Sequence, residues 1–172
     1  MRCLIIGCGC RGQMLASTLR AHGHAVRGTT RNPGRLREIE AAGADAVLGD
    51  PDRVGTLIGA LEHVTVVCIL LGSATGPPEQ LRALHGTRLE MLLTKLIDTT
   101  VRGVVYETSG TVDAAALDAG ARRVRAFGER SPARTALVVG DPSAPKEWLG
   151  SALDAVGRVL DPEYTEGRQR NS

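Results

Sequence analysis

The run VTVVCILL, from Val64 to Leu71, is the longest apolar stretch of the chain, and no polar residue alternates with its apolar ones. A strand that is apolar on both faces is typical of the middle of a parallel sheet, because helices cover such a sheet on both sides. The run is also far shorter than the ~18 residues that cross a bilayer. It therefore predicts a buried central strand of an α/β sheet.

The rest of the chain alternates between strand-like and helix-like segments. Further apolar, β-branched runs predict strands at 3–6, 24–30, 46–48, 103–106 and 135–139. Helical spacing of apolar residues predicts helices at 13–23, 33–43, 54–61, 81–97, 114–127 and 145–160. Six such units predict one doubly wound α/β domain at 1–160, with a mainly parallel six-stranded sheet and helices on both faces. The polar residues 161–172 predict a C-terminal tail.

A glycine-rich turn, GCGCRG, joins the first predicted strand to the first predicted helix. Gly7 permits a tight turn, Gly9 lets a pyrophosphate approach the backbone, and Gly12 allows close packing of helix on strand. Cys10 and Arg11 lie between these glycines and are also expected at the cofactor, and the first turn of the following helix presents unpaired N–H groups to the phosphates. In this context the motif predicts a dinucleotide site.

The end of the second predicted strand indicates which dinucleotide. An acid is usual there for an unmodified ribose, but this chain has Thr30 and Arg31. A hydroxyl and a guanidinium can bind a 2′-phosphate, which a carboxylate would repel. We therefore expect NADP rather than NAD, with Arg31 as the first phosphate ligand and Arg35 as the second. The alternative is that Arg31 is a solvated loop residue.

Two further segments end predicted strands on the same edge of the sheet, where ligands bind in α/β folds. Asp50 follows the third strand, and it can cap a helix, accept the adenine amino group, or do both. Leu70, Leu71 and Gly72 leave the fourth strand, and we expect their backbone to flank the adenine and its ribose.

The cysteines offer a competing interpretation of the glycine turn. Cys8 and Cys10 form a C-x-C pair, but the four histidines show no paired spacing that would complete a zinc site. We therefore predict no metal site, and a redox role for the pair stays open. Cys3 and Cys68 fall in predicted strands and are expected in the core.

Composition excludes other classes of partner. The net charge is +2, and one Phe, two Tyr and one Trp are too few to stack single-stranded bases, so we expect no nucleic acid. No apolar run predicts a membrane span or a signal peptide, and we expect a cytoplasmic protein with reduced thiols. Arginine supplies nearly all of the positive charge, a bias that is typical of high-GC bacterial genomes.

Three stretches, RCLIIGCGCRG, GHAVRGTTRNP and VLGD, together resemble NAD(P)-binding Rossmann proteins. The nearest are the atypical and extended short-chain dehydrogenase/reductases, including NmrA-like proteins, and the match covers roughly residues 2–110. The resemblance implies the strand order 3-2-1-4-5-6. It also implies that Thr30 occupies the position of the ribose-binding acid, Arg31 that of an NADP-selecting arginine, and Asp50 that of the adenine-contacting aspartate.

The chain departs from that family in its catalytic residues. The family uses a Tyr-x-x-x-Lys pair, but neither Tyr106 nor Tyr164 has a lysine four residues on. Ser109 falls near the family's catalytic serine, and extended members continue into a substrate domain where this chain stops. Glu107 and His85 are lone ionisable residues near the expected cleft, and no pattern assigns them a role. The catalytic residues therefore stay unassigned.

Three functions fit these observations. The first is an NADP(H)-dependent oxidoreductase of a small molecule, and the second is a non-catalytic NADP(H) sensor that regulates a partner protein. The third is a Rossmann domain for another nucleotide. The helix at 81–97 and the C-terminal helix also offer surfaces for a homodimer.

Overall fold

Six parallel strands form one sheet in the computed structural model, which describes residues 1–161. The strands are β1 (Arg2–Ile6), β2 (Ala25–Thr30), β3 (Asp45–Leu48), β4 (Val66–Ile69), β5 (Gly103–Glu107) and β6 (Arg134–Val138). Their order is β3-β2-β1-β4-β5-β6, and every neighbouring pair is parallel. The predicted fold class and strand order are confirmed. Most of the predicted tail, with Tyr164, lies outside the described residues.

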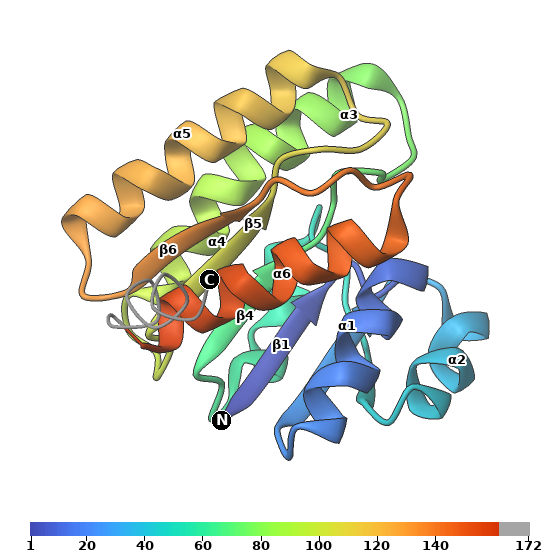
Figure 1. Ribbon diagram of the computed structural model, residues 1–172. Helices are drawn as coiled ribbons and strands as arrows, with labels where there is room; N and C mark the ends of the chain where they lie inside the picture. Colours follow the sequence, from blue (N-terminus) through green and yellow to red (C-terminus); the bar gives the residue numbers. More distant parts are fainter. Residues whose placement is uncertain (162–172) are drawn as a thin grey trace.

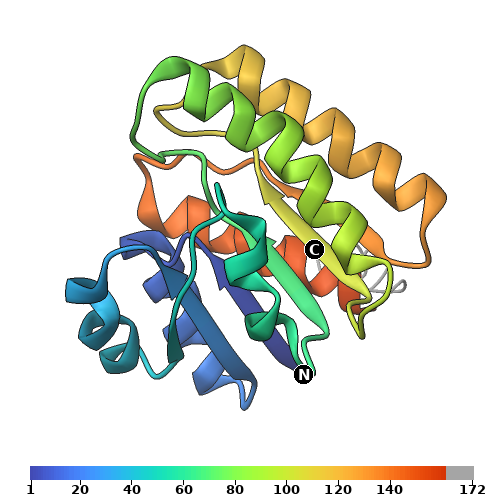
Figure 2. The same cartoon turned by 180° about the vertical axis from the view of Figure 1, so that it is seen from behind.

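Helices cover both faces of this sheet (Figures 1 and 2). They are α1 (Cys10–Ala21), α2 (Leu36–Ala41), α3 (Pro78–Ala83), α4 (Leu89–Leu96), α5 (Ala114–Arg130) and α6 (Pro145–Leu160). One core contains buried side chains of α1, α2 and α6, and the other contains those of α4 and α5. No helix within residues 1–161 is long and apolar enough to cross a membrane.

The central strands explain why the sheet has two cores. In β1, Cys3 and Ile5 belong to the core under α1, whereas Leu4 and Ile6 belong to the opposite core, as strand periodicity requires. All residues of β4 are buried, which confirms the central strand, although it is shorter than the apolar run. The sulfur atoms of Cys3 and Cys68 lie 3.6 Å apart, because β1 and β4 are neighbours.

The predicted helix at 54–61 is instead two 3-10 turns, Val54–Leu57 and Gly59–Leu61. Gly55 and Gly59 lie in this segment, and each glycine costs about 1 kcal/mol relative to alanine inside a helix. Of the four apolar residues that predicted a helical face, Val54, Leu57 and Leu61 are buried, whereas Ile58 is 43% exposed.

The predicted long helix at 81–97 is interrupted. It begins earlier, at Pro78 of α3, and passes through a π turn, Leu84–Arg88, before α4. Gly86 has non-helical dihedral angles, φ −111° and ψ −107°, and marks the break. The break leaves His85 buried, with its Nδ1 atom 2.7 Å from the hydroxyl of Tyr106.

Candidate functional site

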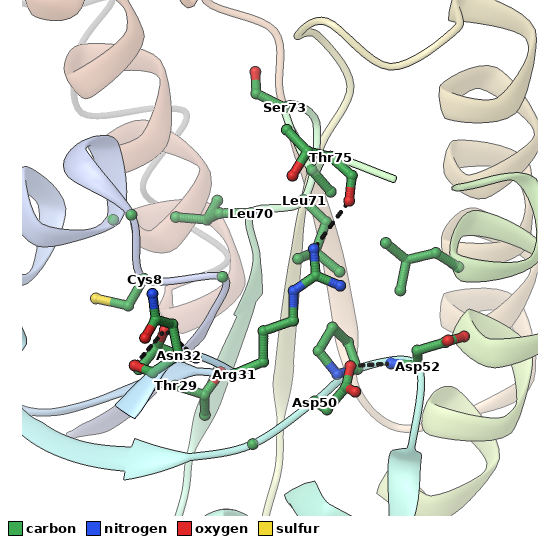
Figure 3. Close-up of a pocket in the computed structure, with 18 of the residues that line it drawn as sticks. Cys8, Thr29, Arg31, Asn32, Asp50, Asp52, Leu70, Leu71, Ser73 and Thr75 are labelled. Atoms are coloured by element: carbon green, nitrogen blue, oxygen red, sulfur yellow. Dashed lines mark hydrogen bonds between the residues drawn. The ribbon is translucent and has the colours of Figure 1, made fainter. Parts of the chain in front are cut away.

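A cavity of about 530 Å³ lies at the carboxyl ends of the central strands (Figure 3). Its walls are the glycine turn after β1, the segment after β2, the loop after β3, the loop after β4, and Glu107 of β5. Of the residues that the sequence predicted, these line it: Gly7, Gly9, Cys10, Arg11, Gly12, Thr30, Arg31, Arg35, Asp50, Leu70 and Leu71. Gly72 is outside the lining. The structure therefore brings together nearly the whole predicted set.

The three glycines of the turn occupy different environments. Gly7 has φ +84°, and a Cβ atom there would lie 2.5 Å from the carbonyl oxygen of Leu70. A Cβ atom on Gly12 would lie 3.2 Å from the carbonyl oxygen of Gly7. A Cβ atom on Gly9 would meet nothing within 4 Å. Gly7 and Gly12 are thus required for packing, whereas the backbone at Gly9 is open to a ligand.

The amino end of α1 provides donors beside Gly9. The helix begins at Cys10, no side chain caps it, and its first turn contains no acid. The first N–H groups of an α-helix have no partner inside the helix, and the helix dipole favours an anion at this end. With the open space at Gly9, this donor set fits the pyrophosphate of a dinucleotide.

The segment after β2 holds the predicted 2′-phosphate ligands. Arg31 is exposed, and its Nη2 atom donates to the carbonyl oxygen of Thr75 at 2.9 Å. Arg35 pairs with Glu38 at 3.1 Å, and that hydrogen bond raises the pKa of Arg35. The Thr30 hydroxyl accepts the N–H of Asn32 at 3.1 Å. Within residues 1–161, Arg31 has no carboxylate within the 4.0 Å of an ion pair.

The loop after β3 places two acids at the cavity. Asp50 Oδ1 accepts the N–H of Asp52 at 3.0 Å, and the next helical turn begins only at Val54. The prediction that Asp50 caps a helix is therefore wrong, because it closes a short turn instead. Hydrogen bonds from Gln80 and then Arg88 hold the pKa of Asp52 below its usual value.

Glu107 lines the cavity near which the sequence placed it, but no sequence pattern indicated its role. Its side chain is 0% exposed. Oε1 accepts from Arg11 Nη2 at 2.8 Å, Arg11 Nε at 3.1 Å and Trp148 Nε1 at 2.9 Å. Oε2 accepts the N–H of Gly72 at 2.8 Å. These partners come from distant parts of the sequence, so no local signal could have identified the cluster.

The side chains around the family's catalytic position are buried or hydrogen-bonded to the backbone. Tyr106 is buried, and burial raises its pKa well above the ordinary value. The hydroxyls of Thr108 and Ser109 donate to the carbonyl oxygens of Val138 at 2.8 Å and Gly140 at 2.9 Å. Tyr106 does not line the cavity, so it does not replace the missing Tyr-x-x-x-Lys pair.

The two cysteines of the turn differ in exposure. Cys8 is buried beneath the turn, and burial raises its pKa to about 12. Cys10 is exposed at the cavity. Among the residues that the structure describes, no three His, Cys, Asp or Glu side chains gather as metal ligands would.

The fold and the glycine turn define a Rossmann protein with a dinucleotide site. The chain belongs to the NAD(P)H-binding family, whose model matches residues 7–136. The comparison with curated proteins gave no match.

Solved structures share this fold at low sequence identity. A short-chain dehydrogenase/reductase superfamily protein from Agrobacterium tumefaciens with bound NAD has 18% identity and a TM-score of 0.66, over 80% of this chain and 48% of that chain. Triphenylmethane reductase from Citrobacter sp., complexed with NADP(H), has 15% identity and a TM-score of 0.62, over 80% and 48%. A protein from Corynebacterium glutamicum, described as a short-chain dehydrogenase/reductase, has 19% identity and a TM-score of 0.70, over 91% and 92%.

The chain spans about half the length of the first two of these proteins. At these identities the neighbours show the fold alone, and they include one structure with bound NAD and one complexed with NADP(H).

Proposed function

We propose that this protein binds NADP(H) in preference to NAD(H). The observation that carries the proposal is Arg31, an exposed guanidinium at the cavity whose hydrogen-bond partner is a backbone carbonyl. A phosphate group is a much stronger acceptor than a carbonyl, and arginine binds it with several parallel N–H groups. A 2′-phosphate would therefore displace Thr75 as the partner of Arg31.

The neighbouring residues support the same cofactor. Arg35 lies one turn on and lines the cavity, although Glu38 shares its charge. Thr30 provides no carboxylate that would repel the phosphate, and Asp50 also lines the cavity, with a carboxylate oxygen for the adenine amino group. The pyrophosphate would then lie against Gly9 and the amino end of α1.

The use of the bound cofactor has two candidates. The first is oxidoreduction of a small molecule, which is supported by the reductases and dehydrogenases among the structural neighbours. Hydride transfer is the cofactor's own chemistry, and this chain would bind, orient and shield it. The second is a non-catalytic NADP(H) sensor. It is favoured because Tyr106 is buried and because the Ser109 hydroxyl donates to the carbonyl oxygen of Gly140.

Calorimetric titration with NADPH, NADP, NADH and NAD tests the proposal. We expect the phosphorylated forms to bind at least roughly tenfold more tightly than NADH and NAD, because charge-assisted hydrogen bonds to phosphate contribute about 1.5–3 kcal/mol. Equal affinities would contradict the NADP assignment. The absence of dinucleotide binding would instead favour a different nucleotide. Oxidation of NADPH in the presence of a panel of carbonyl compounds then separates the enzyme from the sensor.

A further inference from the structure

The Arg11 guanidinium is held rigidly and still has unused donors. Its Nε and Nη2 atoms donate to Glu107, and Nη2 also lies 3.0 Å from the hydroxyl oxygen of Ser73. Its Cζ atom lies 5.5 Å from the centre of the Trp148 ring. Within residues 1–161, the Nη1 amino group has no hydrogen-bond partner, and the side chain is 26% exposed at the cavity. Two N–H groups of Arg11 are therefore free for a ligand.

The position of Arg11 is on the β5 side of the glycine turn. Arg31 follows β2, whereas Glu107 ends β5, and β1 with its glycine turn lies between these strands in the sheet. A pyrophosphate against Gly9 leaves the two nucleosides of a dinucleotide on opposite sides of the turn. With the adenosine 2′-phosphate at Arg31, the nicotinamide nucleoside lies on the side of Arg11.

The charge of the pair indicates what Arg11 recognises. The carboxylate of Glu107 lies 2.8 Å from the guanidinium and balances its charge. Arg11 is therefore a weaker phosphate ligand than Arg31, and its Nη1 donors suit neutral oxygen acceptors. The fully buried Glu107 is itself satisfied by four donors, which makes this arrangement stable without a ligand.

We propose that Arg11 donates hydrogen bonds from Nη1 to the nicotinamide nucleoside of bound NADP(H), at a ribose hydroxyl or the carboxamide oxygen. Glu107 is the positioning residue that holds Arg11 in place for this contact. The inference rests on the proposed function, because it assumes that NADP(H) occupies the cavity. It adds a recognition element for the half of the cofactor that Arg31 does not reach.

The test compares two ligands on the same variants. NADPH contains both nucleosides, whereas adenosine 2′,5′-bisphosphate contains only the half assigned to Arg31. Arg11→Lys keeps a cation beside Glu107 but removes the planar fork, so the variant does not leave an unpaired buried carboxylate. We expect it to bind NADPH roughly tenfold more weakly and the bisphosphate within about twofold of the original affinity.

Glu107→Gln tests the positioning role. The amide oxygen of glutamine can still accept hydrogen bonds, but the ion pair with Arg11 is lost, so we again expect weaker binding of NADPH and little change for the bisphosphate. Arg31→Ala is the comparison variant, because it should weaken the binding of both ligands. Calorimetry reports the number of binding sites separately from the affinity. Partial unfolding of a variant would therefore reduce the number of sites for both ligands alike, whereas the loss of a contact changes the affinity.

The outcomes separate the two proposals. An unchanged NADPH affinity in Arg11→Lys, or an equal loss for both ligands, would overturn the role of Arg11 while the proposed function stands. If Glu107→Gln left the ratio of the two affinities unchanged, the positioning role would be overturned. If the unmodified protein bound neither ligand, the proposed function would fail, and this inference would fail with it.

Discussion

Arg31 Nη2 donates a hydrogen bond of 2.9 Å to the carbonyl oxygen of Thr75, joining the end of β2 to the loop after β4 (Figure 3). Both residues line the cavity, so the contact joins two of its walls. Its donor is charged and its acceptor is neutral, so an anion that enters the cavity competes favourably for the same N–H groups. The contact thus links cofactor binding to the position of the loop after β4.

Arg31→Ala should weaken NADPH binding by roughly 10- to 100-fold, the equivalent of about 1.5–3 kcal/mol for hydrogen bonds to a charged group. NADH lacks the 2′-phosphate, so its affinity should change little. Arg37→Ala is the matched control, because Arg37 is exposed on α2 and does not line the cavity. Calorimetry measures all four affinities. Equal losses for NADPH and NADH would remove Arg31 from the 2′-phosphate site.

Gly9 and Gly7 should respond differently to substitution. Gly9 has extended dihedral angles and open space at the Cβ position, so Gly9→Val should keep the melting temperature of the original protein. The valine side chain would fill the pyrophosphate site and should reduce NADPH affinity at least roughly tenfold.

Gly7→Ala should instead destabilise the fold. The positive φ and the close carbonyl of Leu70 impose a cost of about 1–3 kcal/mol, which lowers the melting temperature of a domain this size by roughly 2–4 °C per kcal/mol. Differential scanning calorimetry without ligand measures both variants. A destabilised Gly9→Val would show that Gly9 serves packing rather than ligand access.

The features that could be predicted from the sequence are those with a local signal. The glycine turn lies within a few residues of β1 and α1, and its spacing indicates both the turn and the ligand. The strand order followed from resemblance, because the pairing of β1 with β4 joins segments far apart in the chain. The two predicted helices that the structure does not form as expected both contain glycines, which have low helix propensity. Gly55 and Gly59 replaced a helix by 3-10 turns, and Gly86 interrupted another.

The Glu107 cluster could not be predicted, because it depends on packing. Its side-chain partners Arg11 and Trp148 lie 96 and 41 residues away along the chain. Only the packing of α1 against α6, and of α6 against β5, brings them to one carboxylate. The same holds for His85, whose contact with Tyr106 depends on the π turn in front of α4.

His85 should make stability depend on pH. Burial lowers its pKa from the usual 6.5, so the folded protein binds the proton less readily than the unfolded chain. Well above pH 6.5 the burial of His85 therefore costs no stability, and the free energy of unfolding falls as the pH drops below 6.5. His85→Gln should reduce the difference in unfolding free energy between about pH 7.5 and about pH 5.5. Urea unfolding at both pH values measures it, with the exposed His22→Gln as control. A full pH dependence in His85→Gln would contradict this assignment.

The cysteines of the glycine turn should differ in reactivity, and the difference tests the hypothesis of a redox role. Cys8 has a pKa of about 12 and is buried, so only about one molecule in 10⁴ carries the reactive thiolate at pH 8. Cys10 is exposed at the cavity, and it should be the thiol that an alkylating reagent modifies in the folded protein. Because Cys10 lies beside the proposed pyrophosphate site, saturating NADPH should slow its modification. Peptide mapping by mass spectrometry identifies the modified residue, and Cys10→Ser should abolish labelling. Rapid labelling of Cys8 would show that the turn opens far more readily than its packing against Gly28 indicates.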